Sequence, residues 1–276
     1  MLPKNDNSNQ EHLPLGEARR GLSIVKIGGN VIENKTALSK FLSIFSQIDG
    51  LKILVHGGGK LATELSKKLG IEPKMIGGRR ITDAQSLDVI TMVYGGLTNK
   101  KIVAGLQSHN CNAVGMSGAD GDTVRAHKRP VKEIDYGFAG DVEGVNAGLL
   151  SHFLTLGLTP VFCAMTHDGK GQLLNTNADT IAAELAIGMS ELYETTLYYC
   201  FEKKGVLLDV NDSNSVVQHI DTETYQSLLK KNIIADGMLP KMTNCFHALN
   251  HKVEKVCIGD VSMLAKTDAI FTTLTL

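Results

Sequence analysis

Short apolar runs alternate with stretches of helical periodicity along most of this chain. The apolar runs are bounded by glycine or polar clusters, and near-continuous hydrophobicity is typical of strands that are covered on both faces. They predict strands at Leu22–Ile27, Lys52–Val55, Ala113–Met116, Thr159–Ala164, Thr195–Tyr199 and Lys255–Ile258. The periodic stretches predict helices at Lys35–Ile48, Lys60–Leu69, Asp83–Ser108, Asn146–Leu156, Ala178–Met189, Asp221–Lys231 and Leu239–Ala248. This alternation predicts an α/β fold with an open, mainly parallel sheet.

The chain is expected to contain an inserted hairpin, an N-terminal arm and two lobes. Thr123–Lys132 and Asp135–Val142 predict a β-hairpin inserted between the strand–helix units. Residues 1–20 are polar and lack the apolar core of a signal peptide, so we expect a disordered arm, with an ordered oligomerisation arm as the alternative. A glycine-rich loop ends just before Asn175 and suggests two lobes, residues 21–174 and 175–276.

Composition narrows the class of protein. The chain has 276 residues with 43% apolar residues and a net charge of −1, which gives no electrostatic reason to expect nucleic acid or an anionic membrane as partner. Five cysteines without a C-x-x-C pair argue against a zinc site and fit a reducing compartment. No apolar run is long enough to span a bilayer. We therefore expect a cytoplasmic protein that has no metal site.

Two of the predicted strands run into glycine turns. The first turn belongs to Ile24–Asn30 (IVKIGGN), where Lys26 interrupts an apolar strand, and the second belongs to Lys52–Lys60 (KILVHGGGK). Glycine allows backbone N–H groups to approach an anion closely, so two such turns suggest two rims around one phosphate group. The pattern is neither a P-loop nor a dinucleotide fingerprint. The phosphate-binding residues that it predicts are Gly28, Gly29 and Gly57. His56, beside the second turn, is expected to be a packed or hydrogen-bonded residue.

Three later polar clusters could carry chemistry. Arg79 and Arg80 precede a helix, and arginine is the preferred bidentate partner of a carboxylate. Leu174–Thr180 contains two asparagines and one aspartate at the start of another helix, and helix capping explains only one of these three side chains. Lys241 lies in the first turn of a late helix, where the macrodipole disfavours a cation unless an anion is near. The plainer interpretations are a solvated loop, a helix cap and a surface lysine.

In this order the motifs resemble the amino acid kinase family, and within it the branch that phosphorylates N-acylated glutamate for arginine biosynthesis. The resemblance extends from Leu22 to about Leu276. It implies an αβα sandwich, a homodimer, and transfer of the γ-phosphoryl group of ATP, with Mg²⁺, to the γ-carboxylate of N-acetyl-L-glutamate. Residues 21–174 would form the acyl-glutamate-binding lobe, and residues 175–276 the nucleotide-binding lobe.

The resemblance also implies roles for single residues. Lys26 and Lys241 would be catalytic, stabilising the transferring phosphoryl group, and Asp179 would organise the two lysines. The residues that would hold the acyl-glutamate are Gly58, Gly59, Arg80 and Asn175. Lys204 and Gly205 would contact the nucleotide, in a segment that departs from the usual family pattern.

That departure leaves the substrate open. Tyr199–Leu207 resembles the version found in Bacteroidetes-like members of the family, some of which use N-succinyl intermediates. N-succinyl-L-glutamate is therefore an alternative substrate, and its extra carboxylate would need a cation such as Arg79, Lys74 or Lys128. A different amino acid kinase and a catalytically silent ligand-binding regulator are also compatible with these motifs. The presence of both lysines and the aspartate argues against the regulator.

Overall fold

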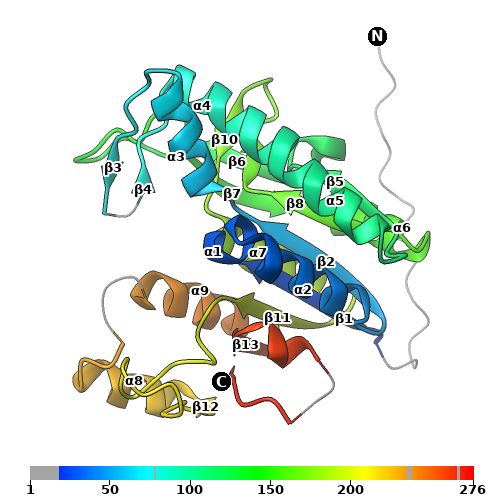
Figure 1. Ribbon diagram of the computed structural model, residues 1–276, viewed down its shortest axis with the longest axis vertical. Coiled ribbons are helices and arrows are strands. Elements are labelled where there is room, and N and C mark those ends of the chain that lie inside the picture. The colour runs from blue at the N-terminus through cyan, green and yellow to red at the C-terminus, as the bar shows by residue number, and fades with distance from the viewer. Residues whose placement is uncertain (1–18, 78, 235–237, 266–267) are drawn as a thin grey trace.

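The computed structural model describes residues 19–77, 79–234, 238–265 and 268–276, and the molecule is a three-layer αβα sandwich (Figure 1). Its middle layer is an eight-stranded sheet of order β12-β14-β13-β11-β1-β2-β8-β5. The strands are β1 (Gly21–Ile27), β2 (Leu51–His56), β5 (Ala113–Met116), β8 (Thr159–Cys163), β11 (Glu194–Cys200), β12 (His219–Ile220), β13 (Lys255–Gly259) and β14 (Thr272–Leu274). All neighbours pair in parallel except β13 and β14, which confirms the predicted sheet. The prediction of a disordered arm falls almost wholly outside the described residues.

Helices cover both faces of the sheet, and each face has its own apolar core. Val25 and Ile27 of β1 share one core with α2 (Lys35–Ser46) and α5 (Asn99–Gln107). Leu22 and Ile24 share the other core with α7 (Ala178–Met189) and its neighbours. The remaining α-helices of the described chain are α1 (Gly29–Glu33), α3 (Gly59–Lys68), α4 (Ala84–Ile90), α6 (Ala147–Thr155), α8 (Thr222–Lys230) and α9 (Met238–Asn250). Side chains alternate along a strand, so Lys26 projects towards α7. Within the described ranges, every helix is too short or too polar to cross a membrane.

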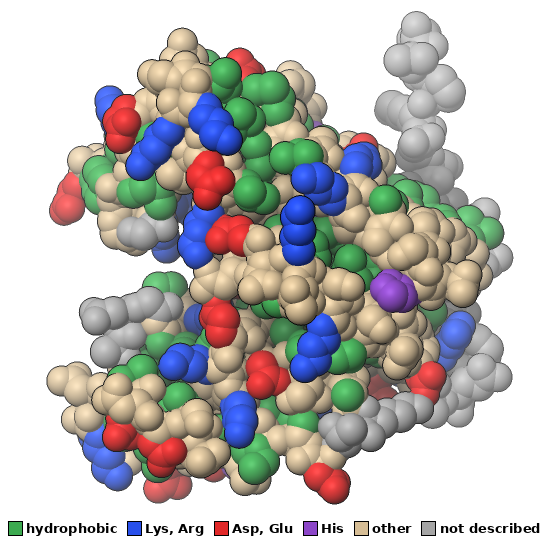
Figure 2. Space-filling view, viewed as in Figure 1, with side chains coloured by type: hydrophobic (Ala, Val, Ile, Leu, Met, Phe, Trp, Pro, Cys, Tyr) green, Lys and Arg blue, Asp and Glu red, His purple; other side chains and the backbone are tan. Residues whose placement is uncertain are grey.

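The winding of the sheet reverses at β1. The chain places β2, β8 and β5 on one side of β1, and later adds β11, β13, β14 and β12 on the other. Both glycine turns leave the carboxyl ends of β1 and β2, and the Gly28 N–H donates to the Cys200 carbonyl at the end of β11 (3.0 Å). Open α/β sheets bind ligands outside the carboxyl ends of strands at such a switch point. Figure 2 shows the surface hollowed between the half that carries α3 and the half that carries α8 and α9, with basic side chains around the hollow.

The predicted hairpin is confirmed, but its second strand begins later than expected. It joins β6 (Val124–Lys128) to β7 (Gly140–Val145) in a second sheet of order β10-β9-β6-β7, with β9 (Met165–His167) and β10 (Leu173–Asn175). The residues before β7 bond to Thr82 instead. The Phe138 N–H donates to the Thr82 carbonyl (2.7 Å), and the Thr82 N–H donates to the Tyr136 carbonyl (3.0 Å). This loop thus ties the second sheet to the segment that follows the arginine pair.

The predicted helix Asp83–Ser108 has nearly the expected extent but is not uniform. Between α4 and α5 the backbone forms a π-helical segment, η1 (Thr91–Thr98), a form that is rare and often found at functional sites. Thr98, the last residue of η1, is buried, and its hydroxyl has no hydrogen-bond partner within the described ranges. A small ribbon of β3 (Met75–Ile76) and β4 (Arg79–Arg80) precedes α4. Each of its strands has two residues, too few for a periodic pattern.

We expect Thr98→Val to raise the free energy of unfolding by roughly 1 kcal/mol, because valine keeps the shape and removes a buried hydroxyl that lacks a partner. Urea unfolding at neutral pH measures the change. Thr272→Val is the matched control: the Thr272 hydroxyl accepts from the Val206 N–H (2.8 Å) and donates to the Val217 carbonyl (2.7 Å). The control should lose stability, and an equal loss in both variants would contradict the prediction.

Candidate functional site

One carboxylate joins two lysines at the centre of the molecule. Asp179 Oδ1 lies 2.6 Å from Lys26 Nζ, and Asp179 Oδ2 lies 3.0 Å from Lys241 Nζ. The three side chains are only 14%, 19% and 17% exposed for Lys26, Asp179 and Lys241. They come from β1, from the first turn of α7 and from α9. Two ammonium groups around one carboxylate leave a net positive charge, which suits the binding of an anion.

The charge state of Asp179 follows from its surroundings. Burial by itself would raise the pKa of this carboxyl, but the charges of Lys26 and Lys241 outweigh burial and lower the pKa from 3.8 to about 2. Asp179 is therefore ionised at neutral pH. Its presence also explains how Lys241 is accommodated near the start of a helix, where the macrodipole opposes a cation.

Tyr199 also contacts the cluster, although no sequence motif singled it out. Its phenol is buried and donates to the Asp179 backbone carbonyl (2.9 Å). Its ring centroid lies 5.1 Å from Lys241 Nζ, a cation–π distance, and the Phe201 ring lies 5.9 Å from the same atom. Tyr199 pairs with Lys26 in the β1–β11 register, so the end of that predicted strand was the available signal.

The polar side chains before α7 have separate partners. Asn177 is the N-cap and accepts from the Asp179 N–H (2.7 Å), while Asp179 itself turns to the lysines. Asn175 Nδ2 donates to the Thr82 hydroxyl (2.9 Å), on the side of the arginine pair. Capping therefore explains one of the three, as predicted.

The two glycine turns lie at the same end of the sheet. A Cβ atom at Gly57 would lie 3.9 Å from the Ala178 Cβ, so the second turn reaches the first turn of α7. Lys60 donates to the Asn30 side chain and lies 3.1 Å from Glu33, which links the start of α3 to α1. The turns thus converge beside the lysine–aspartate cluster, as two rims of one anion site would.

Arg80 and Arg79 differ in placement. Arg79 is exposed, whereas Arg80 is buried and its Nη2 donates to the Gly59 carbonyl (3.1 Å) and the Thr63 hydroxyl (2.6 Å). Among the described residues, no carboxylate forms an ion pair with Arg80. A buried guanidinium without a carboxylate beside a glycine turn is suited to a carboxylate ligand.

The predicted interpretation of His56 is confirmed. The side chain is fully buried, its Nδ1–H donates to the Gly57 carbonyl (2.7 Å), and its Nε2 accepts from the Asn99 amide (3.1 Å). Burial lowers the pKa of His56 to about 4, so the ring is neutral at physiological pH. Its role is to hold the second glycine turn against α5.

Lys204 and Gly205 are not in contact with the lysine–aspartate cluster among the described contacts. Lys204 is exposed and donates to the Asn214 side chain (3.4 Å). Gly205 is buried, and a Cβ there would lie 2.6 Å from the Thr272 hydroxyl, so close packing already requires a glycine. Their contact with a nucleotide stays a prediction.

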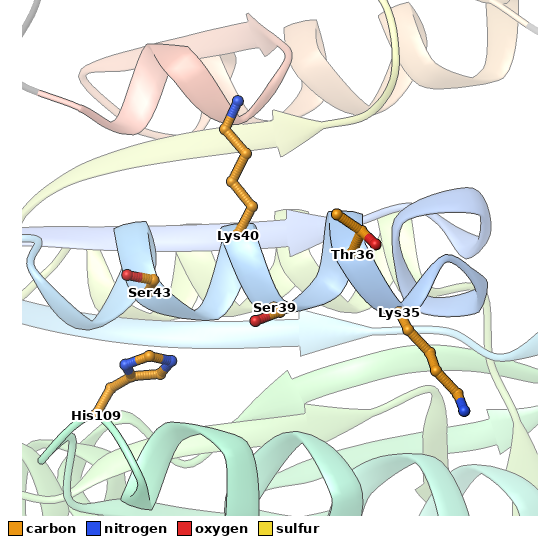
Figure 3. Close-up of a pocket in the computed structure, with 6 residues that line it drawn as sticks. All are labelled: Lys35, Thr36, Ser39, Lys40, Ser43 and His109. Atoms are coloured by element: carbon orange, nitrogen blue, oxygen red, sulfur yellow. The ribbon is translucent and has the colours of Figure 1, made fainter.

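A second hollow lies on the outer face of α2 (Figure 3). Three hydroxyl groups and three basic side chains line it: Lys35, Thr36, Ser39, Lys40, Ser43 and His109. In Figure 3 the side chain of His109 faces Ser39 and Ser43 across the hollow, while the side chain of Lys40 points away from His109. This hollow belongs to the α2 layer, on the opposite side of the sheet from α7, and shares no residue with the cluster.

The molecule is an open α/β protein of three layers, with the Lys26–Asp179–Lys241 cluster at the switch point of its sheet. The sequence profile of the amino acid kinase family matches residues 21–260 of this chain. The chain therefore belongs to that family.

Two relatives with high sequence similarity carry the same name. An acetylglutamate kinase of Phocaeicola vulgatus is 54% identical over 237 residues, which cover 86% of this chain and 92% of the relative. An acetylglutamate kinase of Cytophaga hutchinsonii is 52% identical over 246 residues, which cover 89% of this chain and 93% of the relative. Among solved structures, carbamate kinase from Giardia lamblia bound to AMP-PNP superposes with a TM-score of 0.68 at 12% identity, covering 94% of this chain and 99% of that one, and so shares the fold.

We expect the stability of the protein to depend on Asp179 at acidic pH. The folded-state pKa is below the ordinary value, so the stabilisation is complete above about pH 4 and is lost as pH falls towards 2. Between pH 6 and pH 3 the wild type should lose roughly 1 kcal/mol more free energy of unfolding than Asp179→Asn. Urea titrations at both pH values measure this difference.

Glu191→Gln is the control for that experiment. The pKa of Glu191 is also lowered, by its hydrogen bond with Lys252, but both side chains are exposed and solvent screens the pair. This variant should follow the wild type across the pH range. An acid response of Asp179→Asn identical to the wild type would show that the two lysines do not hold the carboxylate ionised.

Proposed function

We propose that this protein is an ATP-dependent kinase that phosphorylates the γ-carboxylate of N-acetyl-L-glutamate, a step of arginine biosynthesis. The observation that carries the proposal is the Lys26–Asp179–Lys241 cluster at the switch point of an amino acid kinase sheet. Relatives at 54% and 52% identity, both named acetylglutamate kinase, support the choice of substrate.

The chemistry asks for little acid–base catalysis. A γ-carboxylate oxygen is already ionised near neutral pH and attacks the γ-phosphorus, while the bond to the β–γ bridging oxygen breaks and ADP leaves. The two anions must be brought together, and charge on the transferring group must be neutralised. Lys26 and Lys241 supply that charge, and Asp179 fixes both ammonium groups before substrate arrives. The neutral, fully bonded His56 is not required as a base.

The remaining predicted residues would bind different parts of the two substrates. Arg80 would pair with the α-carboxylate of the substrate, beside Gly58, Gly59 and Asn175. The backbone N–H groups of the phosphate-binding glycines Gly28, Gly29 and Gly57 would contact the transferring group, and Mg²⁺ would enter with the ATP phosphates. Lys204 and Gly205 would contact the nucleotide.

The two lobes of the chain would each bind one substrate. Residues 21–174 would bind the acyl-glutamate, and residues 175–276 the nucleotide. In the sheet, β2 lies on one side of the switch at β1, and β11 and β13 lie on the other side. A homodimer in the cytoplasm, without nucleic-acid or membrane partners, follows from the family resemblance and the near-neutral charge.

A panel of acceptors tests the function. ATP turnover is measured with N-acetyl-L-glutamate, N-succinyl-L-glutamate, L-glutamate and buffer alone. Turnover that depends on the acetyl compound supports the proposal. Preference for the succinyl compound or for free glutamate would assign a different acceptor, and the absence of turnover with any acceptor would favour a ligand-binding regulator.

Lys26→Ala and Lys241→Ala should each lower kcat by about two to three orders of magnitude and affect the KM of both substrates less, because each removes a preorganised charge that acts on the transition state. Steady-state kinetics measure both constants. Lys252→Ala, which removes an exposed lysine paired with Glu191, is the control and should leave kcat unchanged. Near-normal kcat in either test variant would remove that lysine from the mechanism.

Arg80→Ala should raise KM for the acyl-glutamate at least about tenfold while KM for ATP changes little, because a charge-assisted bond to a carboxylate is lost. Arg79→Ala is the matched control, since that neighbouring arginine is exposed. The reverse pattern, with a higher KM in the Arg79 variant alone, would move the carboxylate site to Arg79.

A further inference from the structure

A tyrosine on the π-helical segment lies against the second glycine turn. Tyr94 is 6% exposed, and a Cβ atom added to Gly58 would lie 2.9 Å from its Cδ1 and 3.0 Å from its Cε1. At these distances the ring of Tyr94 leaves no room for a side chain at position 58.

The phenol of Tyr94 also reaches Gly59, the next residue of the turn. Its oxygen lies 3.7 Å from the Cβ position of Gly59, which is an exposed residue. The Gly59 carbonyl accepts from Arg80, so the phenol and the guanidinium flank one residue. Among the described residues, the Tyr94 hydroxyl has no hydrogen-bond partner, although tyrosine hydroxyls in buried side chains usually find one.

The protonation of Tyr94 makes it a donor. Burial raises the pKa of its phenol, and the nearby Arg80 charge opposes this effect without cancelling it. The hydroxyl therefore keeps its proton at neutral pH. Tyr94 lies in the π-helical segment, which helps to explain the direction of its side chain. Successive residues of an α-helix are rotated by about 100°, and a widened π-helical turn changes the direction in which its side chains point.

We propose that Tyr94 is a further substrate-binding residue, whose hydroxyl donates to an oxygen of the bound acyl-glutamate next to Arg80. The proposal rests on the proposed function, because it names a donor for the same acceptor substrate. The ligand class is an N-acylated amino dicarboxylic acid, in which carboxylate and acyl oxygens are all acceptors. Arg80 supplies charge and Tyr94 a neutral, directional hydrogen bond.

The plainer interpretation is that Tyr94 only fills the core. Its ring belongs to the larger apolar cluster, with Val93 and Ala62. Phenylalanine would serve that purpose equally well, because it keeps the ring and loses only the hydroxyl. Tyr94→Phe therefore separates the two interpretations in one substitution.

The experiment compares Tyr94→Phe with the wild type in steady-state kinetics and in calorimetric titration with N-acetyl-L-glutamate, or with whichever acceptor the panel identifies. KM and Kd for the acceptor should rise about tenfold, which corresponds to about 1.4 kcal/mol, while KM for ATP stays within about twofold. Tyr193→Phe is the matched control: Tyr193 is equally buried, but its hydroxyl already bonds to Ser151 (2.6 Å). The control should leave acceptor binding unchanged.

The outcomes distinguish this inference from the proposed function. An unchanged KM and Kd in Tyr94→Phe, with a wild type that turns over, would overturn the role of Tyr94 and leave the kinase assignment intact. A wild type without acceptor-dependent turnover would overturn the kinase assignment itself. If Tyr94→Phe melts at a lower temperature, the rise in Tm caused by acceptor is measured against its own ligand-free Tm. A rise as large as that of the wild type would then refute the inference.

Discussion

The contact on which the rest of this structure depends is the bridge of Asp179 between Lys26 and Lys241. Its three side chains come from β1, α7 and α9, which are far apart in sequence and meet only in the complete sandwich. A lysine on an inner face of the sheet would be costly by itself, because an unpaired buried charge opposes folding. The bridge lets the fold tolerate two such lysines, and it fixes the positions of their ammonium groups relative to each other.

The bridge does not neutralise the site, and that imbalance matters for function. One carboxylate against two ammonium groups leaves positive charge at the carboxyl ends of the strands, where glycine turns offer N–H groups. Arg80, beside the second glycine turn, is another positive charge that is not neutralised. It is buried, and among the described residues no carboxylate forms an ion pair with it. In the proposed reaction, the phosphates of ATP would meet the two lysines, and a carboxylate of the acceptor would meet Arg80.

Much of this arrangement could be predicted from the sequence, for a local reason. Strands and glycine turns are determined by residues that are neighbours in the sequence. For this reason β1, β2, α3 and the position of Lys26 could be predicted from the sequence pattern. Contacts between distant residues could not be predicted in that way. Asn175 bonds to Thr82 across 93 positions, and Tyr199 bonds to the backbone carbonyl of Asp179, a contact for which the end of a predicted strand was the one available signal. The two-residue strands β3, β4 and β12 were missed because two residues carry no period.

Gly58 shows how one residue can satisfy two requirements that sequence reasoning cannot separate. The run of three glycines suggested close approach of backbone to a phosphate, and the structure adds a second close approach, that of the Tyr94 ring. An alanine at Gly58 would push against that ring, so it would disturb the tyrosine and the turn together. The Gly58→Ala variant could therefore not tell backbone recognition of the substrate from positioning of Tyr94. Removal of the hydroxyl alone can, because it leaves the ring, the turn and its N–H groups in place.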